Sequence, residues 1–236
     1  MKKRFWTSVE VVAEGDGFAV TLDGRKVKTP AKVDLVLPNR ALAETVAEEW
    51  RAVEAEIDPS VMHFTRLCNA AIDKVGIQHI EIVEMLAAYG ETDLLCHRAD
   101  SPDALADRQA AAWDPVLQWA RDVHGLKFEV VAGVLPGTQP AESITGLADW
   151  LSGKCRFSLM AIHDLTTISG SVLLAWAVDA RQISARDAWV ASRIDEVWQE
   201  EQWGIDSAAS KVSATKQAEF LRAARLLEMV SGDGHA

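Results

Sequence analysis

The sequence predicts an α+β fold, with a small antiparallel β domain at the amino terminus followed by a larger, mostly α-helical domain. Short apolar runs separated by turn signals occupy residues 4–37, whereas apolar residues at helical spacing dominate the chain from residue 39 onward. A length of 236 residues is enough for one large domain or two modest ones. We place the boundary between residues 60 and 61, which gives domains 1–60 and 61–236.

The first part of the chain contains the signals of four short strands. The sequence EGDG at residues 14–17 separates the first two strands, and Asp23-Gly24 between two extended runs is a strong signal for a tight hairpin. Pro30 interrupts the following run, and a fourth strand ends before Pro38. Four sequential strands predict an antiparallel meander or a small barrel, which should also pack against a helix.

The first helix is expected to begin after Asn39, because asparagine is a favourable N-cap residue. Leu42, Val46, Trp50 and Val53 recur at helical spacing and form one apolar face, with glutamate and arginine residues elsewhere on the helix. Trp50 stands in the middle of this face. We therefore predict that Trp50 has a structural role in the packing of the amino-terminal domain.

Helical patterns continue through most of the remaining chain. The predicted helices span about residues 78–90, 101–125, 139–152, 156–168, 170–180, 184–204 and 206–231. Pro115 lies inside the second of these, so it either kinks one helix or stands at the first position of a second helix capped by Asp114. Residues 126–135 are a candidate extra strand, the sequence SGS at residues 169–171 is a candidate helix cap, and the tail 232–236 is expected to be disordered.

The stretch from Ser184 to Gly204 has an unusual pattern for a helix. Val190, Ile194, Val197 and Trp198 form one apolar stripe, which is the face expected to enter a core. On the opposite face Trp189, Glu196 and Trp203 stand seven residues apart, so that a carboxylate lies between two indoles. A solvated face does not need two tryptophans. This helix is therefore packed on two sides or presents a surface to a partner, and the pattern leaves both readings open.

Composition excludes several classes of protein. A net charge of −11 and a pI near 5.0 argue against nucleic acid as the main partner. The three cysteines Cys68, Cys96 and Cys155 are far apart and fit a reducing compartment better than disulfides. No apolar run is long enough to span a bilayer, and no secretory signal follows Met1. We therefore expect a cytoplasmic protein.

Motifs that would carry chemistry are weak. The glycines of residues 14–17 lie in a hairpin instead of a phosphate-binding loop, and the histidines lack the spacing of a metal site. Residues 169–171 lack the frame of a nucleophile elbow. We predict no catalytic residue, no metal and no cofactor. The alternative is a hydrolase or transferase that gathers His97 or His163 with a carboxylate in a pocket.

Nine tryptophans against one tyrosine are the most unusual feature of the composition. Most of them lie in amphipathic helical patterns, where a large aromatic side chain stabilises a core. Tryptophan is also enriched among the anchors of protein interfaces. The sequence does not decide between a core and an interface role for the Ser184–Gly204 stretch.

Seven blocks of the sequence, taken in order, resemble a known family. They are LDGRKVKTP, AEEW, IDPSVMHFTRLCNAAID, ETDLLCHRA, WDPVLQW, GSVLLAWAV and RIDEVWQEEQWG. Together they cover about residues 4–206 and identify the chain as a member of the ATP synthase assembly chaperone family (ATP12-type) that acts on the alpha subunit of the catalytic head. His63 and Phe64 depart from the family pattern, which expects a proline and an aliphatic residue at those positions.

The resemblance implies a fold and a function. It implies a small β domain and a larger helical domain, no catalysis and no nucleotide requirement. It also implies that the protein binds the free alpha subunit and covers the surface that the beta subunit later occupies. Interaction with a different client remains an alternative. The start at Met1 suggests a bacterial cytoplasmic protein, whereas eukaryotic relatives are expected in the mitochondrial matrix.

The resemblance also suggests partner-binding residues. The acidic position of the family near the last block matches Asp195 or Glu196, and the register between the two stays open. Helix geometry favours Glu196 for display because it lies between Trp189 and Trp203. With Gln199 these residues form the predicted partner-binding set.

Overall fold

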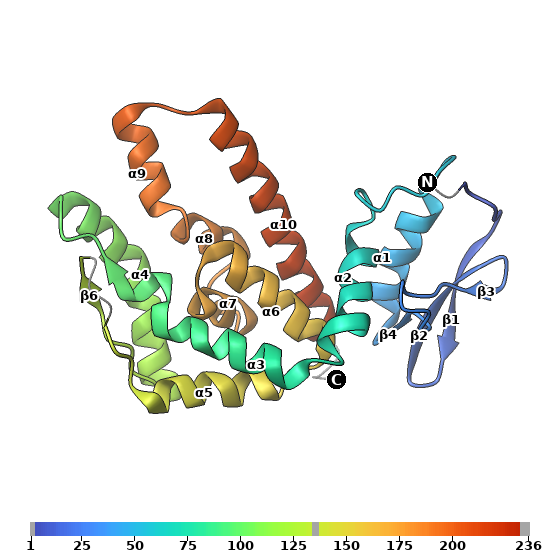
Figure 1. Cartoon of the computed structure of the whole chain (residues 1–236), viewed down its shortest axis with the longest axis horizontal. Coiled ribbons are helices and arrows are strands. Elements are labelled where there is room, and N and C mark those ends of the chain that lie inside the picture. Colours follow the sequence, from blue (N-terminus) through green and yellow to red (C-terminus); the bar gives the residue numbers. More distant parts are fainter. Residues whose placement is uncertain (1–2, 134–136, 232–236) are drawn as a thin grey trace. The chain divides into compact units, whose positions relative to one another are not determined.

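The computed structural model describes residues 3–133 and 137–231 and has the predicted α+β fold (Figure 1). Contacts divide the chain into two compact units. Unit 1 contains the sheet and comprises Met1–His79, Cys155–Ala161 and Arg225–Ala236, and unit 2 comprises Ile80–Lys154 and Ile162–Ala224. This division is not the same as the expected boundary between residues 60 and 61, which stays a prediction.

The sheet of unit 1 is antiparallel and is built around its second strand. Its strands are β1 (Val9–Glu14), β2 (Gly17–Leu22), β3 (Arg25–Lys26) and β4 (Val36–Leu37). β1, β2 and β3 form the predicted meander, but β4 pairs with β2, with Phe18 opposite Leu37. Because β3 pairs with only two residues of β2, the rest of that edge is left free for β4.

The two hairpin turns form where the sequence predicted them. Gly15 has φ 55° in the turn between β1 and β2. Asp23 and Gly24 have φ 48° and 76° between β2 and β3, the left-handed values that a type I′ turn requires. The Asp23 carboxylate also accepts hydrogen bonds from the backbone N–H groups of Ser8 and Thr7. These bonds lower the pKa of Asp23 and fix the start of β1 against the second turn.

Helix α1 (Arg40–Arg51) packs against β1, β2 and β4. The Asn39 side chain caps it as predicted, accepting from Leu42 N at 2.9 Å, and its amide donates to Met229 O at 2.7 Å. Leu42 and Val46 are fully buried. Trp50 is half-buried, with its ring 5.4 Å from that of Trp6, and so lies at the margin of this core.

The remaining elements are mostly helical, as expected. Unit 1 continues with α2 (His63–Ala70), which passes directly into a π-helical turn, Ala71–Val75. The elements that follow are α3 (His79–Ala88), short 3-10 turns at Tyr89–Thr92 and Leu94–Cys96, β5 (His97–Arg98), α4 (Asp103–His124), β6 (Val131–Ala132), α5 (Ala141–Ser152), α6 (Arg156–Ser169), α7 (Val172–Asp179), α8 (Ala185–Ala191), α9 (Ile194–Trp203) and α10 (Ser207–Ser231).

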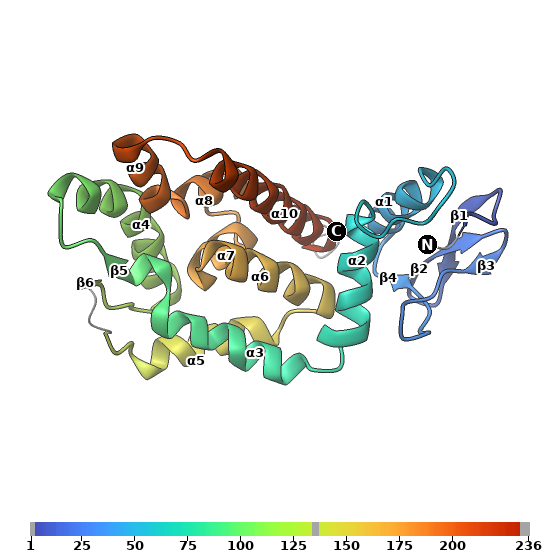
Figure 2. The same cartoon turned by 45° about the horizontal axis from the view of Figure 1, so that its top comes forward.

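Two open questions about the middle of the chain are answered. Of the two alternatives at Pro115, the structure has one helix, α4, which continues through the proline and ends at Gly125 with φ 72°. The candidate extra strand is present as β6, which pairs in parallel with β5 (Figure 2). The expectations for residues 134–136 and for the tail 232–236 lie outside the described residues.

The core of unit 2 surrounds α7, whose residues Val172–Ala177 are all buried and which contacts α4 and α8 (Figure 2). Ser171 caps α7 as predicted, accepting from Leu174 N at 2.9 Å. Trp119 and Trp176 stack edge to face with ring centroids 4.9 Å apart. Most of the tryptophans are thus core residues. In the described ranges, no helix is both long and apolar enough to cross a membrane.

Asp93 is the most deeply buried carboxylate of unit 2. It accepts hydrogen bonds from the Ser171 hydroxyl at 2.7 Å and from the N–H groups of Leu95 and Leu173 at 3.0 and 3.1 Å. Burial raises the pKa of Asp93 to about 6 despite these bonds. The carboxylate thereby holds the start of α7 and the turn Leu94–Cys96 together.

Candidate functional site

The stretch from Ser184 to Gly204 is not the single helix that the sequence predicts. It forms two helices, α8 and α9, separated at Ser192 and Arg193. Ser184 caps α8 as expected, accepting from Asp187 N at 3.1 Å.

Two bonds explain the interruption between α8 and α9. The Trp113 indole donates to Ala191 O at 2.8 Å, and the Ser192 hydroxyl donates back to Trp189 O at 2.8 Å. The carbonyl of Ala191 is therefore held by a residue of α4, and the serine completes the last turn of α8 locally. Neither contact could be read from the helical periodicity of the stretch.

The interruption separates the three residues that were predicted to share one face. Trp189 is only 5% exposed and packs against Phe220, with ring centroids 5.8 Å apart. Trp203 is 79% exposed. The prediction that Trp189, Glu196 and Trp203 form one displayed face is therefore wrong, and Trp189 is a core residue.

The stripe that was expected to enter the core is also only partly buried. Ile194 is buried and Trp198 is half-buried, but Val190 is 64% and Val197 42% exposed. The guanidinium carbon of Arg108 lies 5.0 Å from the centre of the Trp198 ring. The two valines therefore belong to the surface of the segment, which is the opposite of the prediction.

The two acidic candidates have different surroundings. The Asp195 carboxylate accepts from the Gln109 amide at 2.6 Å, and the oxygen of this buried amide accepts from Ala99 N at 2.8 Å. Glu196, whose side chain is 44% exposed, forms an ion pair with Arg193 three residues earlier. Gln199 is exposed. Asp195 thus positions a neighbouring loop, whereas Glu196 is available at the surface.

An apolar groove lies between α4 and the α8–α9 segment, which we call the α4–α8 groove. Its volume is about 530 Å³. The alanines Ala111 and Ala112 of α4 and the apolar residues of α8 and α9 dominate its lining, while charge is confined to Arg108 and Asp187. The lining residues are Arg108, Ala111, Ala112, Ile183, Asp187, Val190, Ala191, Ile194 and Val197.

Large exposed apolar residues continue beyond this groove along the chain. Trp203, Ile205 and Val212 are all more than half exposed, at the end of α9, in the following loop and near the start of α10. We call Val190, Val197, Trp203, Ile205 and Val212 the apolar strip. An apolar groove with exposed apolar side chains on the helices that line it is typical of a protein-interaction surface. The sequence pattern did not indicate the contribution of α4, because alanine is equally common in buried and exposed helix positions.

The described residues show little that supports an enzyme. Neither the α4–α8 groove nor the groove of unit 1 described below is lined by a histidine. His163 does contact a carboxylate, with its Nδ1 3.0 Å from Asp164 Oδ1. Burial raises the pKa of the Cys68 thiol well above its usual range and that of Cys96 to about 12. No cluster of metal-binding side chains occurs within the described ranges.

The fold and the α4–α8 groove together are typical of a protein that binds another polypeptide, and comparison with known proteins narrows this class. The model of the family described as ATP12 chaperone protein matches residues 3–121. Atp12 from Paracoccus denitrificans has a crystal structure that aligns with a TM-score of 0.92 at 42% sequence identity, covering 96% of this chain and 97% of that chain.

Two further relatives agree with this match. The crystal structure of the Atu1473 protein from Agrobacterium tumefaciens aligns with a TM-score of 0.91 at 38% identity, covering 96% of this chain and 85% of that chain. Protein atp12, mitochondrial, of Schizosaccharomyces pombe is 20% identical over 245 residues, 99% of this chain and 84% of that protein. The chain belongs to the ATP12 chaperone family. This membership confirms the predicted class of function, a chaperone of ATP synthase assembly.

Proposed function

We propose that this protein is a non-enzymatic chaperone that binds the free alpha subunit of the F-type ATP synthase catalytic head in the bacterial cytoplasm. In this proposal it covers the surface that the beta subunit later occupies and is displaced when the beta subunit arrives. The observation that supports it best is the α4–α8 groove with its apolar strip, in a chain of this chaperone family.

The physical reason for such a chaperone is the exposed interface of an unassembled subunit. A large apolar interface without its neighbour is an aggregation hazard. A chaperone surface that shields this interface must be apolar enough to compete with self-association of the subunit. It must also be able to separate from the interface again. The α4–α8 groove is open to solvent and carries exposed valines on two separate short helices, which suits reversible contact.

Within this surface we assign contact roles to four of the predicted residues. Trp203 supplies a large exposed indole, and aromatic anchors of this kind dominate many interfaces. Glu196 and Gln199, on the same helix as the groove residues Ile194 and Val197, add polar contacts. Asp195 acts on the client indirectly, because its carboxylate holds Gln109 and through it the loop at Ala99.

An aggregation assay tests the proposal. Purified alpha subunit is diluted from denaturant, without ATP, in the presence of an equal amount of the chaperone, and light scattering is followed. We expect the native chain to suppress scattering and to co-purify with the alpha subunit. Val197→Asp places a charge in the groove and should remove most of this suppression.

The matched control is Val130→Asp, since Val130 is exposed to a similar extent in unit 2 but lies outside the groove. It should behave like the native chain. Equal loss in both variants would place the client elsewhere. Suppression of beta-subunit aggregation to the same extent would favour a general interaction module over a chaperone specific for the alpha subunit.

A further inference from the structure

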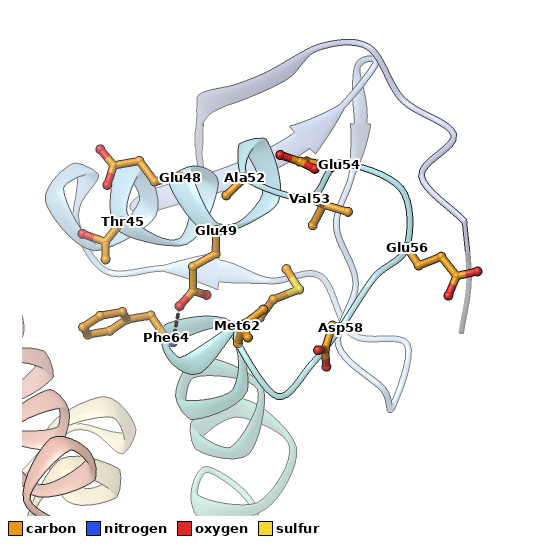
Figure 3. Close-up of a pocket in the computed structure, with 11 residues that line it drawn as sticks. Thr45, Glu48, Glu49, Ala52, Val53, Glu54, Glu56, Asp58, Met62 and Phe64 are labelled. Carbon is orange, nitrogen blue, oxygen red and sulfur yellow. Dashed lines mark hydrogen bonds between the residues drawn. The ribbon is translucent and has the colours of Figure 1, made fainter. Parts of the chain in front are cut away.

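A second groove lies in unit 1, between the carboxyl end of α1 and the start of α2 (Figure 3). We call it the α1–α2 groove; its volume is about 480 Å³. It differs from the α4–α8 groove in combining an apolar floor with carboxylates from α1 and the following loop. The lining residues are Thr45, Glu48, Glu49, Ala52, Val53, Glu54, Glu56, Asp58, Val61, Met62 and Phe64.

The floor of the α1–α2 groove is apolar. Val53 and Met62 are buried and lie near each other in Figure 3, and the half-buried Phe64 also lines the groove, on the other side of Glu49. Val61 is 64% exposed at the edge. Methionine is unbranched and polarisable, so a floor containing Met62 can adapt to apolar side chains of different shapes.

The carboxylates of this groove fall into two groups. Glu49 accepts from the N–H groups of Phe64 and Thr65 at 2.7 and 2.8 Å, and Asp58 accepts from Ser60 N at 2.9 Å. The carboxylates of Glu49 and Asp58 are therefore occupied by hydrogen bonds to the backbone of this same region. Glu48, Glu54 and Glu56 form no side-chain hydrogen bond or ion pair with any described residue.

The charges that line the groove distinguish it from the rest of unit 1, although Lys3 pairs with Glu56 in an isolated β-bridge and the Arg4 guanidinium donates to Val53 O beside it. Glu14 pairs with Lys26, Asp34 with Lys28, and Glu44 with Arg51. By contrast, the lining of the α1–α2 groove contains five carboxylates and no lysine or arginine. An apolar occupant alone would leave Glu48 and Glu54 without a counter-charge from the lining. A segment that also carries lysine or arginine would supply one.

From this complementarity we infer that the α1–α2 groove binds an extended polypeptide segment in which apolar side chains alternate with lysine or arginine. The apolar side chains lie against Val53, Met62 and Phe64, and the cationic side chains reach Glu48, Glu54 and Glu56. This inference is independent of the proposed function, which places the client in unit 2. It adds a second polypeptide-binding surface, on the β-containing unit of the molecule.

Fluorescence anisotropy of the full chain with three labelled nonapeptides tests the inference. The first peptide alternates lysine and leucine, the second replaces lysine by glutamate, and the third replaces leucine by glycine. We expect saturable binding of the first peptide and at least about tenfold weaker binding of the other two. Binding of the first should weaken between about 50 mM and about 300 mM salt, because exposed charges are screened.

Two double variants locate the site. Glu54→Gln with Glu56→Gln should weaken binding of the lysine–leucine peptide about fivefold, since exposed charge contacts are individually modest. The control is Glu10→Gln with Asp16→Asn, which removes the same net charge from exposed positions outside the groove. Val61→Ser should weaken the same peptide without changing the salt dependence.

Several outcomes would overturn the inference. They are equal weakening in both double variants, binding of the glutamate peptide as tight as that of the lysine peptide, and no saturable binding at all. Displacement of the peptide by calcium at millimolar concentration, with calcium alone binding the native chain but not the Glu54→Gln, Glu56→Gln variant, would make this a cation site instead. Failure here leaves the alpha-subunit assay unaffected, because that assay reports on Val197 in unit 2.

Discussion

Both compact units use a carboxylate from an earlier element to hold the start of a helix, but they bury it differently. In unit 1, Glu49 of α1 binds the first N–H groups of α2 and stays half-buried. In unit 2, Asp93 binds the start of α7 and is fully buried. The bonds are alike, yet burial raises the pKa of Asp93 to about 6. The strength of the cap on α7 should therefore depend on pH.

The largest effect is expected from Asp93→Ala. The substitution leaves the Ser171 hydroxyl and two buried N–H groups without their acceptor, and each orphaned donor costs roughly 1–3 kcal/mol. We expect the free energy of unfolding at pH 5 to fall by about 3–5 kcal/mol in chemical denaturation. A loss below about 1 kcal/mol would mean that water replaces the carboxylate.

The pH dependence of stability tests the effect of burial itself. Because the pKa of Asp93 is higher in the folded state than the ordinary value of 3.8, the folded chain binds the proton more tightly. The contribution of Asp93 to stability should therefore decrease as pH rises from about 4 to 6, by about 3 kcal/mol at most, and stay constant above. Denaturation of the native chain and of Asp93→Asn across this range checks it. Parallel curves would show that Asp93 titrates normally.

Glu49, the half-buried counterpart of Asp93, should contribute less to the free energy of unfolding. Glu49→Ala removes the acceptor of Phe64 N and Thr65 N, which solvent can partly replace. We expect a loss of about 1–2 kcal/mol in the free energy of unfolding, below that of Asp93→Ala. Equal losses in the two variants would show that burial does not decide the strength of these caps.

The Asn39 cap of α1, whose partner Leu42 lies in the same turn, should contribute still less to the free energy of unfolding. Asn39→Ala removes the bond to Leu42 N within the same turn, together with the amide contact to Met229 O. The expected loss is about 1 kcal/mol, measured by thermal and chemical unfolding. Asn39→Asp keeps the acceptor at the helix start and should recover most of this loss.

The smallest effect on stability is expected from a carboxylate that caps nothing. Glu196→Lys removes a partly exposed ion pair with Arg193, three residues away on the same segment, which is worth roughly 0.5 kcal/mol. The unfolding free energy should hardly change, while suppression of alpha-subunit aggregation should decrease. A loss of stability above about 1 kcal/mol would instead assign Glu196 a structural role.

Local signals in the sequence were sufficient for much of the fold. The cap residues Asn39, Ser171 and Ser184 were recognised because their partners lie within three residues, and the Asp23-Gly24 turn because the residue types determine it. Glu49 and Asp93 were missed as caps. Their partners lie 15 and 78 residues away, and the sequence shows no local sign of such a pair.

The candidate site was less predictable for the same reason. Periodicity placed Val190 and Val197 in the core, and both are exposed, whereas Trp189, for which the pattern left a core and a partner-facing role open, is buried. The cause is a residue far away in the sequence. Trp113 lies 78 residues before Ala191, and its indole donates a hydrogen bond to the carbonyl of Ala191. Ala111 and Ala112 line the groove without any signal that a sequence pattern could provide.

The interruption at Ser192 and Arg193 also determines in which direction the side chains of α9 face. An α-helix turns by about 100° per residue, so residues seven apart in a continuous helix face nearly the same way. With two non-helical residues between α8 and α9, Trp189 faces inward and Trp203, fourteen residues later, faces outward. A variant that joined the two helices would turn Val197 and Trp203 together by a large angle. The exposed surface of this segment thus depends on the interruption that the hydrogen bonds of Trp113 and Ser192 hold.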